Sequence, residues 1–126
     1  MKYIFDTYTW IEILKGSSEG SRANFLIKDD DIIITSDATF AEIYSWAKRC
    51  DTIPGEMIKL IREQSQVFPI YTNIWVEAAS HKENMRKQKK DFGQIDALLL
   101  AIQDVTGATI VTGDPHFKGL KNVIML

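Results

Sequence analysis

Four acidic residues stand out in this chain because each is isolated among apolar neighbours. Asp6 and Asp114 each follow an apolar, strand-like run, whereas Glu42 and Asp96 are the only charges near the starts of two apolar helical stretches. In a parallel α/β sheet, the strand ends and the starts of the following helices converge on one edge. Four carboxylates gathered there would repel one another without a cation, and their hard oxygen atoms suit Mg²⁺ or Mn²⁺.

An acidic site of this kind carries out a limited set of reactions. With its metal ion it activates water and neutralises the charge that builds on a phosphate oxygen, as in phosphodiester or phosphate-ester cleavage. Thr112 could position a ligand or a water molecule beside Asp114, or it could simply end a strand. Two structural alternatives also stay open. Glu42 could share a solvent-facing stripe with Arg49, and Asp96 could be a helix-start acid favoured by the helix dipole.

Other common catalytic sites lack their parts in this sequence. Cys50 is the single cysteine, and His81 and His116 are the only histidines. Zinc hydrolysis and Cys-His nucleophilic catalysis are therefore not supported. No glycine-rich loop of the P-loop or dinucleotide type is present. We expect His116 to be a turn residue rather than a catalytic base.

The elements that must position the acids alternate along the chain. This alternation indicates an α/β fold with three layers, α/β/α, around a central, mostly parallel sheet of about five strands. We expect strands at 1–5, 32–35, 67–70, 108–112 and 122–125, and helices at 8–14, 18–28, 37–50, 54–64, 73–90 and 95–106. Thr7 is expected to cap the first helix. Phe40, Ile43, Tyr44 and Ala47 are expected to form the buried stripe of the third.

Size and composition set the wider frame. A hydrophobic content of 45% in 126 residues suffices for one core, so we expect residues 1–126 to form a single domain. The lone Cys50 points to a reducing compartment. No signal peptide or membrane-spanning run is recognisable, which predicts a cytoplasmic protein with no membrane contact. The net charge of −2 means that any nucleic-acid partner must be held by a local basic patch.

The end of the expected fifth helix offers such a patch. The stretch from Lys82 to Lys90 carries five basic residues and one acid. These bases could hold RNA phosphates, or they could be a solvated helix end whose cations complement the helix dipole.

The ordered set of acids resembles PIN-domain ribonucleases, especially the small single-domain toxins of VapC type. The resemblance covers the whole length and rests on Phe5-Asp6-Thr7, Ala41-Glu42-Ile43, Ile95-Asp96-Ala97 and Val111-Thr112-Gly113-Asp114 followed by Phe117. It implies a metal-dependent endoribonuclease in which Asp6, Glu42, Asp96 and Asp114 surround Mg²⁺ or Mn²⁺ and Thr112 assists. It also implies an RNA substrate, a homodimer and an antitoxin partner.

Two positions depart from the family pattern, and three rival functions stay open. Tyr8 stands where the family more often has a small or amide residue, and Gly113 replaces a common polar residue. The rivals are a housekeeping RNA-processing nuclease, a degenerate PIN-fold binding module and a phosphatase of the haloacid-dehalogenase type. The phosphatase motif needs a second Asp where this chain has Tyr8. A receiver-type signalling domain is also disfavoured. Its phosphoacceptor Asp would stand at the end of an internal strand, where this chain has Thr35 or Ile70.

Overall fold

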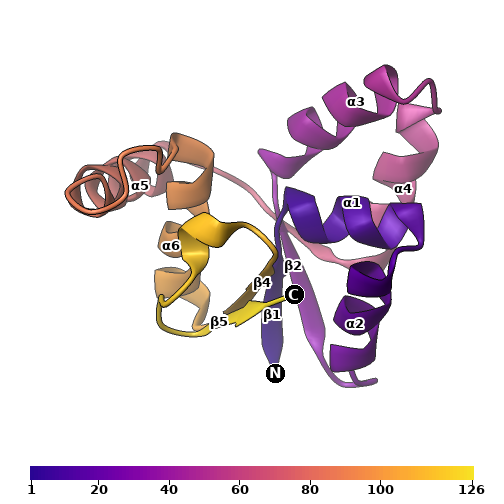
Figure 1. The fold of residues 1–126 in the computed structure, drawn as a ribbon, viewed down its shortest axis with the longest axis horizontal. Coiled ribbons are helices and arrows are strands. Elements are labelled where there is room, and N and C mark those ends of the chain that lie inside the picture. The colour runs from indigo at the N-terminus through magenta and orange to yellow at the C-terminus, as the bar shows by residue number, and fades with distance from the viewer.

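A single parallel sheet forms the centre of the molecule. The computed structural model describes residues 1–126, and its five strands lie in the order β3-β2-β1-β4-β5, with every neighbouring pair parallel (Figure 1). The strands are β1 (Lys2–Phe5), β2 (Ile32–Ser36), β3 (Gln66–Phe68), β4 (Thr109–Thr112) and β5 (Val123–Met125). The sequence-based expectation of an α/β fold around a mostly parallel sheet of about five strands is therefore confirmed, and the sheet is parallel throughout.

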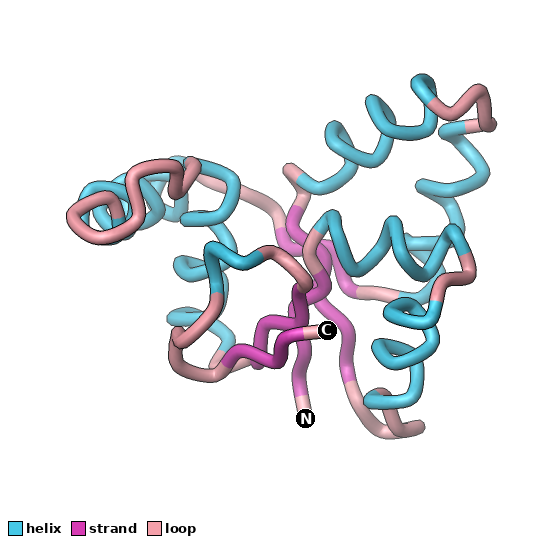
Figure 2. Tube along the Cα trace, viewed as in Figure 1, coloured by secondary structure: helices cyan, strands magenta, loops and turns pink.

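Helices cover both faces of this sheet. They are α1 (Thr7–Lys15), α2 (Ser18–Leu26), α3 (Thr39–Arg49), α4 (Pro54–Gln64), α5 (Thr72–Met85) and α6 (Gln94–Thr106), with a short 3₁₀ helix, η1 (Pro115–Phe117). Helices α1 to α4 lie on one side of the strands and α5 and α6 on the other, as both ribbon and tube show (Figures 1 and 2). None of these helices combines the length and the hydropathy that a membrane span requires.

The central strand β1 contributes to two separate hydrophobic cores. Tyr3 and Phe5 pack with Trp10 and the helices α1 to α4, whereas Ile4 packs with the apolar face of α6. Successive side chains of a strand point to opposite faces, so a strand covered on both sides must be apolar throughout. This requirement explains why the run before Asp6 has no polar alternation.

The register of the central strands sets the position of the candidate site. Phe5 of β1 pairs with Val111 of β4 in parallel. The next residues, Asp6 and Thr112, therefore leave the sheet side by side at its carboxyl edge. Ligand sites in open α/β sheets form at this edge.

Three local expectations were wrong. Asp6, not Thr7, caps α1, because its carboxylate accepts a hydrogen bond from the backbone N–H of Thr9. Tyr44 is 51% exposed, since the buried face of α3 is formed by Thr39, Phe40, Ile43 and Ala47, and Tyr44 lies at its margin.

The third correction concerns the end of the fifth helix. Helix α5 ends at Met85, so residues 86–90 form turns rather than a continued helix. The chain must turn here because Phe92 is fully buried and packs against Phe117 with ring centroids 5.6 Å apart. The Nε atom of Arg86 donates to the carbonyl of Phe92 at 2.9 Å and stabilises this turn.

Candidate functional site

Asp6 is fixed by hydrogen bonds on both of its carboxylate oxygens. Oδ1 accepts from the backbone N–H of Thr9 at 2.8 Å, which caps α1, and Oδ2 accepts from the hydroxyl of Thr112. The side chain of Thr9 in turn donates to the carbonyl of Val111 at 2.6 Å. These bonds join the start of α1 to the end of β4, and Asp6 is left only 7% exposed.

Thr112 connects the two acids that end strands. Its hydroxyl donates to Asp6 and accepts from the backbone N–H of Asp114 at 2.9 Å. The side chain is fully buried and does not line the pocket described below. Thr112 is thus placed to orient the carboxylate of Asp6 and the backbone of Asp114.

Asp114 presents one oxygen to the protein and leaves the other free. Oδ1 accepts from the backbone N–H of His116 at 2.9 Å, which caps η1, and lies 2.7 Å from the Nδ1 atom of the His116 ring. No hydrogen bond within the protein involves Oδ2. His116 was expected to be a turn residue, and it does lie in a turn. The contact of its ring with Asp114 was not anticipated.

Asp96 approaches the same point from the opposite helix layer. It lies in the first turn of α6, and its Oδ2 accepts from the backbone N–H of Gly93 at 3.3 Å. Ligand atoms of Asp96, Asp114 and His116 lie within 4.8 Å of one another. Asp96 therefore has the helix-start role considered as an alternative and also contributes to the acidic cluster.

Glu42 reaches the site from α3 on the other side of the sheet. Its Oε1 accepts from the hydroxyl of Thr7 at 2.6 Å, which leaves Oε2 without a protein partner. Glu42 is exposed, and it also borders a shallow depression shared with Ala41, Ser45 and Arg49. Glu42 thus lies on a solvent-facing stripe with Arg49, as one interpretation predicted, and also borders the acidic pocket, as the other predicted.

All four acids line one pocket of about 190 Å³. Its walls are formed by Asp6, Thr7, Tyr8, Thr39, Glu42, Ile95, Asp96, Leu99 and Asp114. The acids come from the ends of β1 and β4 and from the first turns of α3 and α6. The structure therefore brings the four predicted metal ligands together. Their roles in catalysis and metal binding are proposed below.

Burial and mutual repulsion raise the pKa values of two of these acids. Desolvation raises the pKa of Asp6 to about 6 from an ordinary value of 3.8, with a smaller contribution from the charge of Asp114, while hydrogen bonds from Thr112 and Thr9 act in the opposite direction. Desolvation also raises the pKa of Asp96, and the charges of Asp114 and Glu42 add to this effect. The cluster therefore holds more negative charge than its surroundings favour, and a cation would relieve this.

The donor set fits a hard divalent cation. Asp96, Asp114 and Glu42 each have one oxygen anchored by the protein and one without a protein partner. No cysteine approaches the pocket, and no lysine or arginine lines it to neutralise the acids. Carboxylate oxygens in this arrangement suit Mg²⁺ or Mn²⁺ better than they suit soft metals.

Sequence reasoning missed three residues near the site. Thr7 was assigned to helix capping but holds Glu42, and Thr39 and His116 were not predicted to contribute. Tyr8, a departure from the family pattern, does line the pocket. For Thr7 and His116 the only available signal was proximity in sequence, because Thr7 follows Asp6 directly and His116 follows Asp114 by two residues. For Thr39, no sequence feature gave such a signal.

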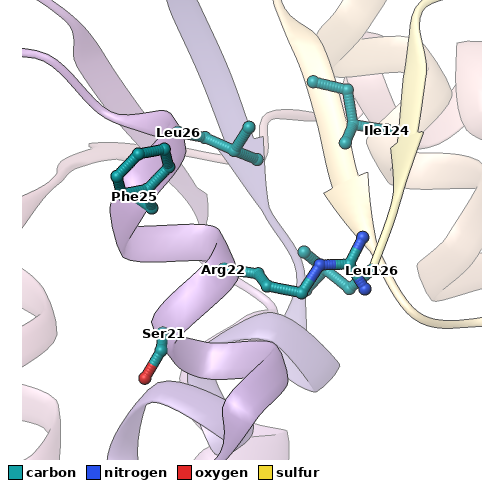
Figure 3. A pocket seen from close by; sticks show the side chains of 6 residues that line it. All are labelled: Ser21, Arg22, Phe25, Leu26, Ile124 and Leu126. Carbon is teal, nitrogen blue, oxygen red and sulfur yellow. The ribbon is translucent and has the colours of Figure 1, made fainter.

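A second pocket, which we call the α2 pocket, has a different character. It is lined by Ser21, Arg22, Phe25, Leu26, Ile124 and Leu126, and its volume is about 390 Å³. Figure 3 shows the side chain of Leu26 on α2 extending toward the strand that carries Ile124. Phe25 is 91% exposed. Such an apolar, solvent-exposed surface is typical of contact sites rather than of catalytic ones.

Comparison with known proteins identifies relatives of this architecture. A family model described as PIN domain matches residues 3–123. VapBC2 from Rickettsia felis, solved with a DNA fragment from its promoter, has a TM-score of 0.77 at 16% identity and covers 100% of this chain and 98% of its own. A toxin-antitoxin complex from Klebsiella pneumoniae has a TM-score of 0.72 at 20% identity, covering 98% and 96%.

A third similar structure is VapC20 from Mycobacterium tuberculosis, described as a toxin that cleaves the sarcin-ricin loop, with a TM-score of 0.67 at 15% identity over 85% of each chain. No curated protein matches the chain. At these identities the solved structures bear on the fold alone, whereas the family match spans Asp6, Glu42, Asp96 and Asp114 in sequence order. The chain belongs to the PIN-domain family, and its fold is that of VapC-type PIN domains.

Proposed function

We propose that this protein is a metal-dependent endoribonuclease that hydrolyses RNA phosphodiester bonds at the four-carboxylate pocket. The observation that carries the proposal is the convergence of Asp6, Glu42, Asp96 and Asp114 from four different elements on one pocket. PIN domains are generally nucleases, which agrees with this chemistry. In the reaction, a water oxygen bonds to phosphorus while one ester P–O bond breaks.

The residues of the chain divide this work. Asp96, Asp114 and Glu42 would hold the cation through their free oxygens, and Asp6 through a carboxylate already oriented by Thr9 and Thr112. Bound Mg²⁺ or Mn²⁺ would lower the pKa of water and offset charge on the phosphate oxygens.

Anchoring by backbone N–H groups and hydroxyls restricts the carboxylates before any substrate binds. Thr112 orients Asp6 and Asp114, and Thr7 orients Glu42. Such preorganisation lowers the reorganisation that the reaction would otherwise require.

A cleavage assay on a mixed pool of single-stranded RNA tests this proposal. We expect cleavage with Mg²⁺ or Mn²⁺ and none in chelator. Asp96→Asn keeps an oxygen to accept from Gly93 but removes the charge, and it should abolish cleavage. The matched control is Asp30→Asn, which removes one exposed acid in a turn remote from the pocket and should cleave like the parent.

Undiminished cleavage in chelator, or by Asp96→Asn, would refute the metal-nuclease proposal. A parent that binds RNA without cleaving it under any metal condition would indicate a PIN-fold binding module instead.

We propose in addition that the nuclease is the toxin of a toxin-antitoxin pair. Support comes from the similar structures, several of which are toxin-antitoxin complexes, and from the exposed Phe25 beside the α2 pocket, which offers an apolar contact surface next to the cation of Arg22. A partner that inserts an apolar side chain flanked by an acid would complement it. A housekeeping RNA-processing role is the competing function.

Expression in a bacterial host separates these two roles. A toxin should arrest growth, Asp96→Asn should not, and co-expression of a small protein encoded next to this gene should restore growth to the parent. Phe25→Ser should weaken that rescue without changing RNA cleavage in vitro. Growth unaffected by an active nuclease would favour the housekeeping role. The homodimer stays a prediction, which light scattering of the purified chain would test.

A further inference from the structure

The ring of Tyr8 lies so close to Gly113 that no side chain larger than glycine's hydrogen fits at position 113. A Cβ atom placed on Gly113 would lie 2.2 Å from Cε1 of Tyr8, 2.5 Å from its Cζ and 2.8 Å from its Cδ1. The aromatic ring therefore occupies the space that any other residue at position 113 would need. The backbone does not demand glycine there, because Gly113 is not among the residues with positive φ. The ring of Tyr8 is what requires it.

This contact fixes an aromatic ring at the mouth of the acidic pocket. Tyr8 lies two residues after Asp6, and Gly113 directly precedes Asp114, so the pair bridges the same two strand ends that carry acids. Tyr8 lines the pocket and is nevertheless 37% exposed as a residue. No hydrogen bond holds its hydroxyl, so the ring is positioned by packing, which includes its close approach to Gly113.

The pocket thus has an acidic part and an apolar part. Four of its nine lining residues are acids, whereas Tyr8, Ile95 and Leu99 are apolar, and none is basic. Lining side chains therefore supply no positive charge to attract an RNA phosphate. Stacking of a base on an aromatic ring contributes affinity without any cation, and it suits every base because each has a π-face.

We infer that the ring of Tyr8, held by Gly113, is a stacking platform for one unpaired base of the RNA next to the phosphate that enters the acidic pocket. The inference rests on the proposed nuclease function and assigns a substrate-positioning residue to its site. A stacked base fixes the register of the strand, so Tyr8 would determine which phosphate reaches the acids. It would also favour single-stranded RNA, because a base within a duplex is not free to stack on the protein.

Photo-crosslinking and base removal test this inference together. The first probe is a short single-stranded oligoribonucleotide that carries iodouridine, and peptide mapping should place the main crosslink on Tyr8. The second is a cleavable RNA from which one base at a time is removed. For the parent, loss of one particular base beside the cleaved bond should reduce kcat/KM by about 5- to 150-fold, which is the range for base–aromatic stacking.

Three variants separate stacking from simple packing. Tyr8→Phe keeps the flat ring, so it should retain both the crosslink at position 8 and the penalty for base removal. Tyr8→Leu keeps apolar bulk but no flat ring, so it should cleave intact RNA more weakly and lose the penalty for base removal. Gly113→Ala should displace the ring and resemble Tyr8→Leu, and it should add no further loss of activity in the Tyr8→Leu background. Thermal melts of all three confirm that each variant is folded.

The outcomes distinguish failure of this inference from failure of the proposed function. If the parent cleaves RNA but Tyr8→Leu shows the same base-removal penalty, or the crosslink lies on another residue, the stacking role is refuted and the nuclease stands. If the parent never cleaves RNA yet crosslinks through Tyr8, the nuclease proposal fails and the stacking role holds. If neither cleavage nor a Tyr8 crosslink is found, both are refuted.

Discussion

The buried carboxylate of Asp6 should make the stability of the metal-free protein fall as pH rises. Its folded pKa of about 6 exceeds the ordinary value of 3.8, so between these values the folded state binds more protons than the unfolded state. Stability contributed by such a group is fully present below the unfolded pKa and is lost as pH rises through the folded pKa. The difference corresponds to about 3 kcal/mol in the free energy of unfolding.

Asp6→Asn removes this titration and gives the contrast to measure. The amide oxygen can still accept from the backbone N–H of Thr9. The amide nitrogen, however, faces the hydroxyl of Thr112, which donates to Asp6 in the parent and already accepts from the backbone N–H of Asp114. Loss of the hydrogen bond between position 6 and Thr112 costs about 1 kcal/mol of stability. This cost is the same at any pH, because neither the Asn amide nor the Thr112 hydroxyl titrates in this range. The variant should therefore be less stable than the parent below about pH 4 and more stable by roughly 2 kcal/mol above about pH 7.

Thermal or urea unfolding in chelator over this pH range is the assay. Acids other than Asp6 titrate in both proteins, so the difference between parent and variant isolates this side chain. The difference between the melting temperatures of parent and variant should change by roughly 10 °C or more between about pH 4 and about pH 7. In Mn²⁺ at about a hundredfold excess over Kd, the parent should regain about 2.7 kcal/mol at neutral pH. A parent-minus-variant difference that does not change with pH in chelator would refute the reasoning.

Two further predictions concern surfaces and packing. The double variant Lys87→Gln, Lys90→Gln removes two exposed bases and should flatten the plot of log RNA affinity against log salt by up to about 1.4 in slope. Lys89 donates to two backbone carbonyls, so its removal should lower stability instead. An unchanged slope in the double variant would mean that the basic turn is only solvated. Gly20→Ala should lower the free energy of unfolding by about 1 to 3 kcal/mol in a urea melt, because a Cβ there would lie 2.3 Å from a backbone oxygen of α1. In the control, Gly55→Ala, the new Cβ meets open space and should not destabilise α4. Equal effects of the two substitutions would contradict the close approach of α1 and α2.

Much of the fold and the set of acids was already evident in the sequence. Asp6 and Asp114 are recognisable because a strand buried on both faces must be apolar to its end, which makes the first charge after it conspicuous. Asp96 is recognisable for a similar reason, as the single charge between Gln94 and Gln103 in an otherwise apolar stretch of helix. These signals arise within a few residues of each acid, and the rule that parallel strands share a carboxyl edge supplies the rest.

Contacts between distant residues were decided by the tertiary structure alone. Thr7 binds Glu42 across 35 positions, and Thr112 binds Asp6 across 106, so nothing in the neighbourhood of either residue reveals its partner. The same holds for the ring of Tyr8 on Gly113, which sequence comparison shows only as two separate departures from the family pattern. Desolvation of Asp6, which raises its pKa, likewise depends on helices and strands that meet only after folding. Local residue patterns therefore place the acids at the sheet edge, whereas their orientation, charge state and aromatic neighbour follow from how the layers dock.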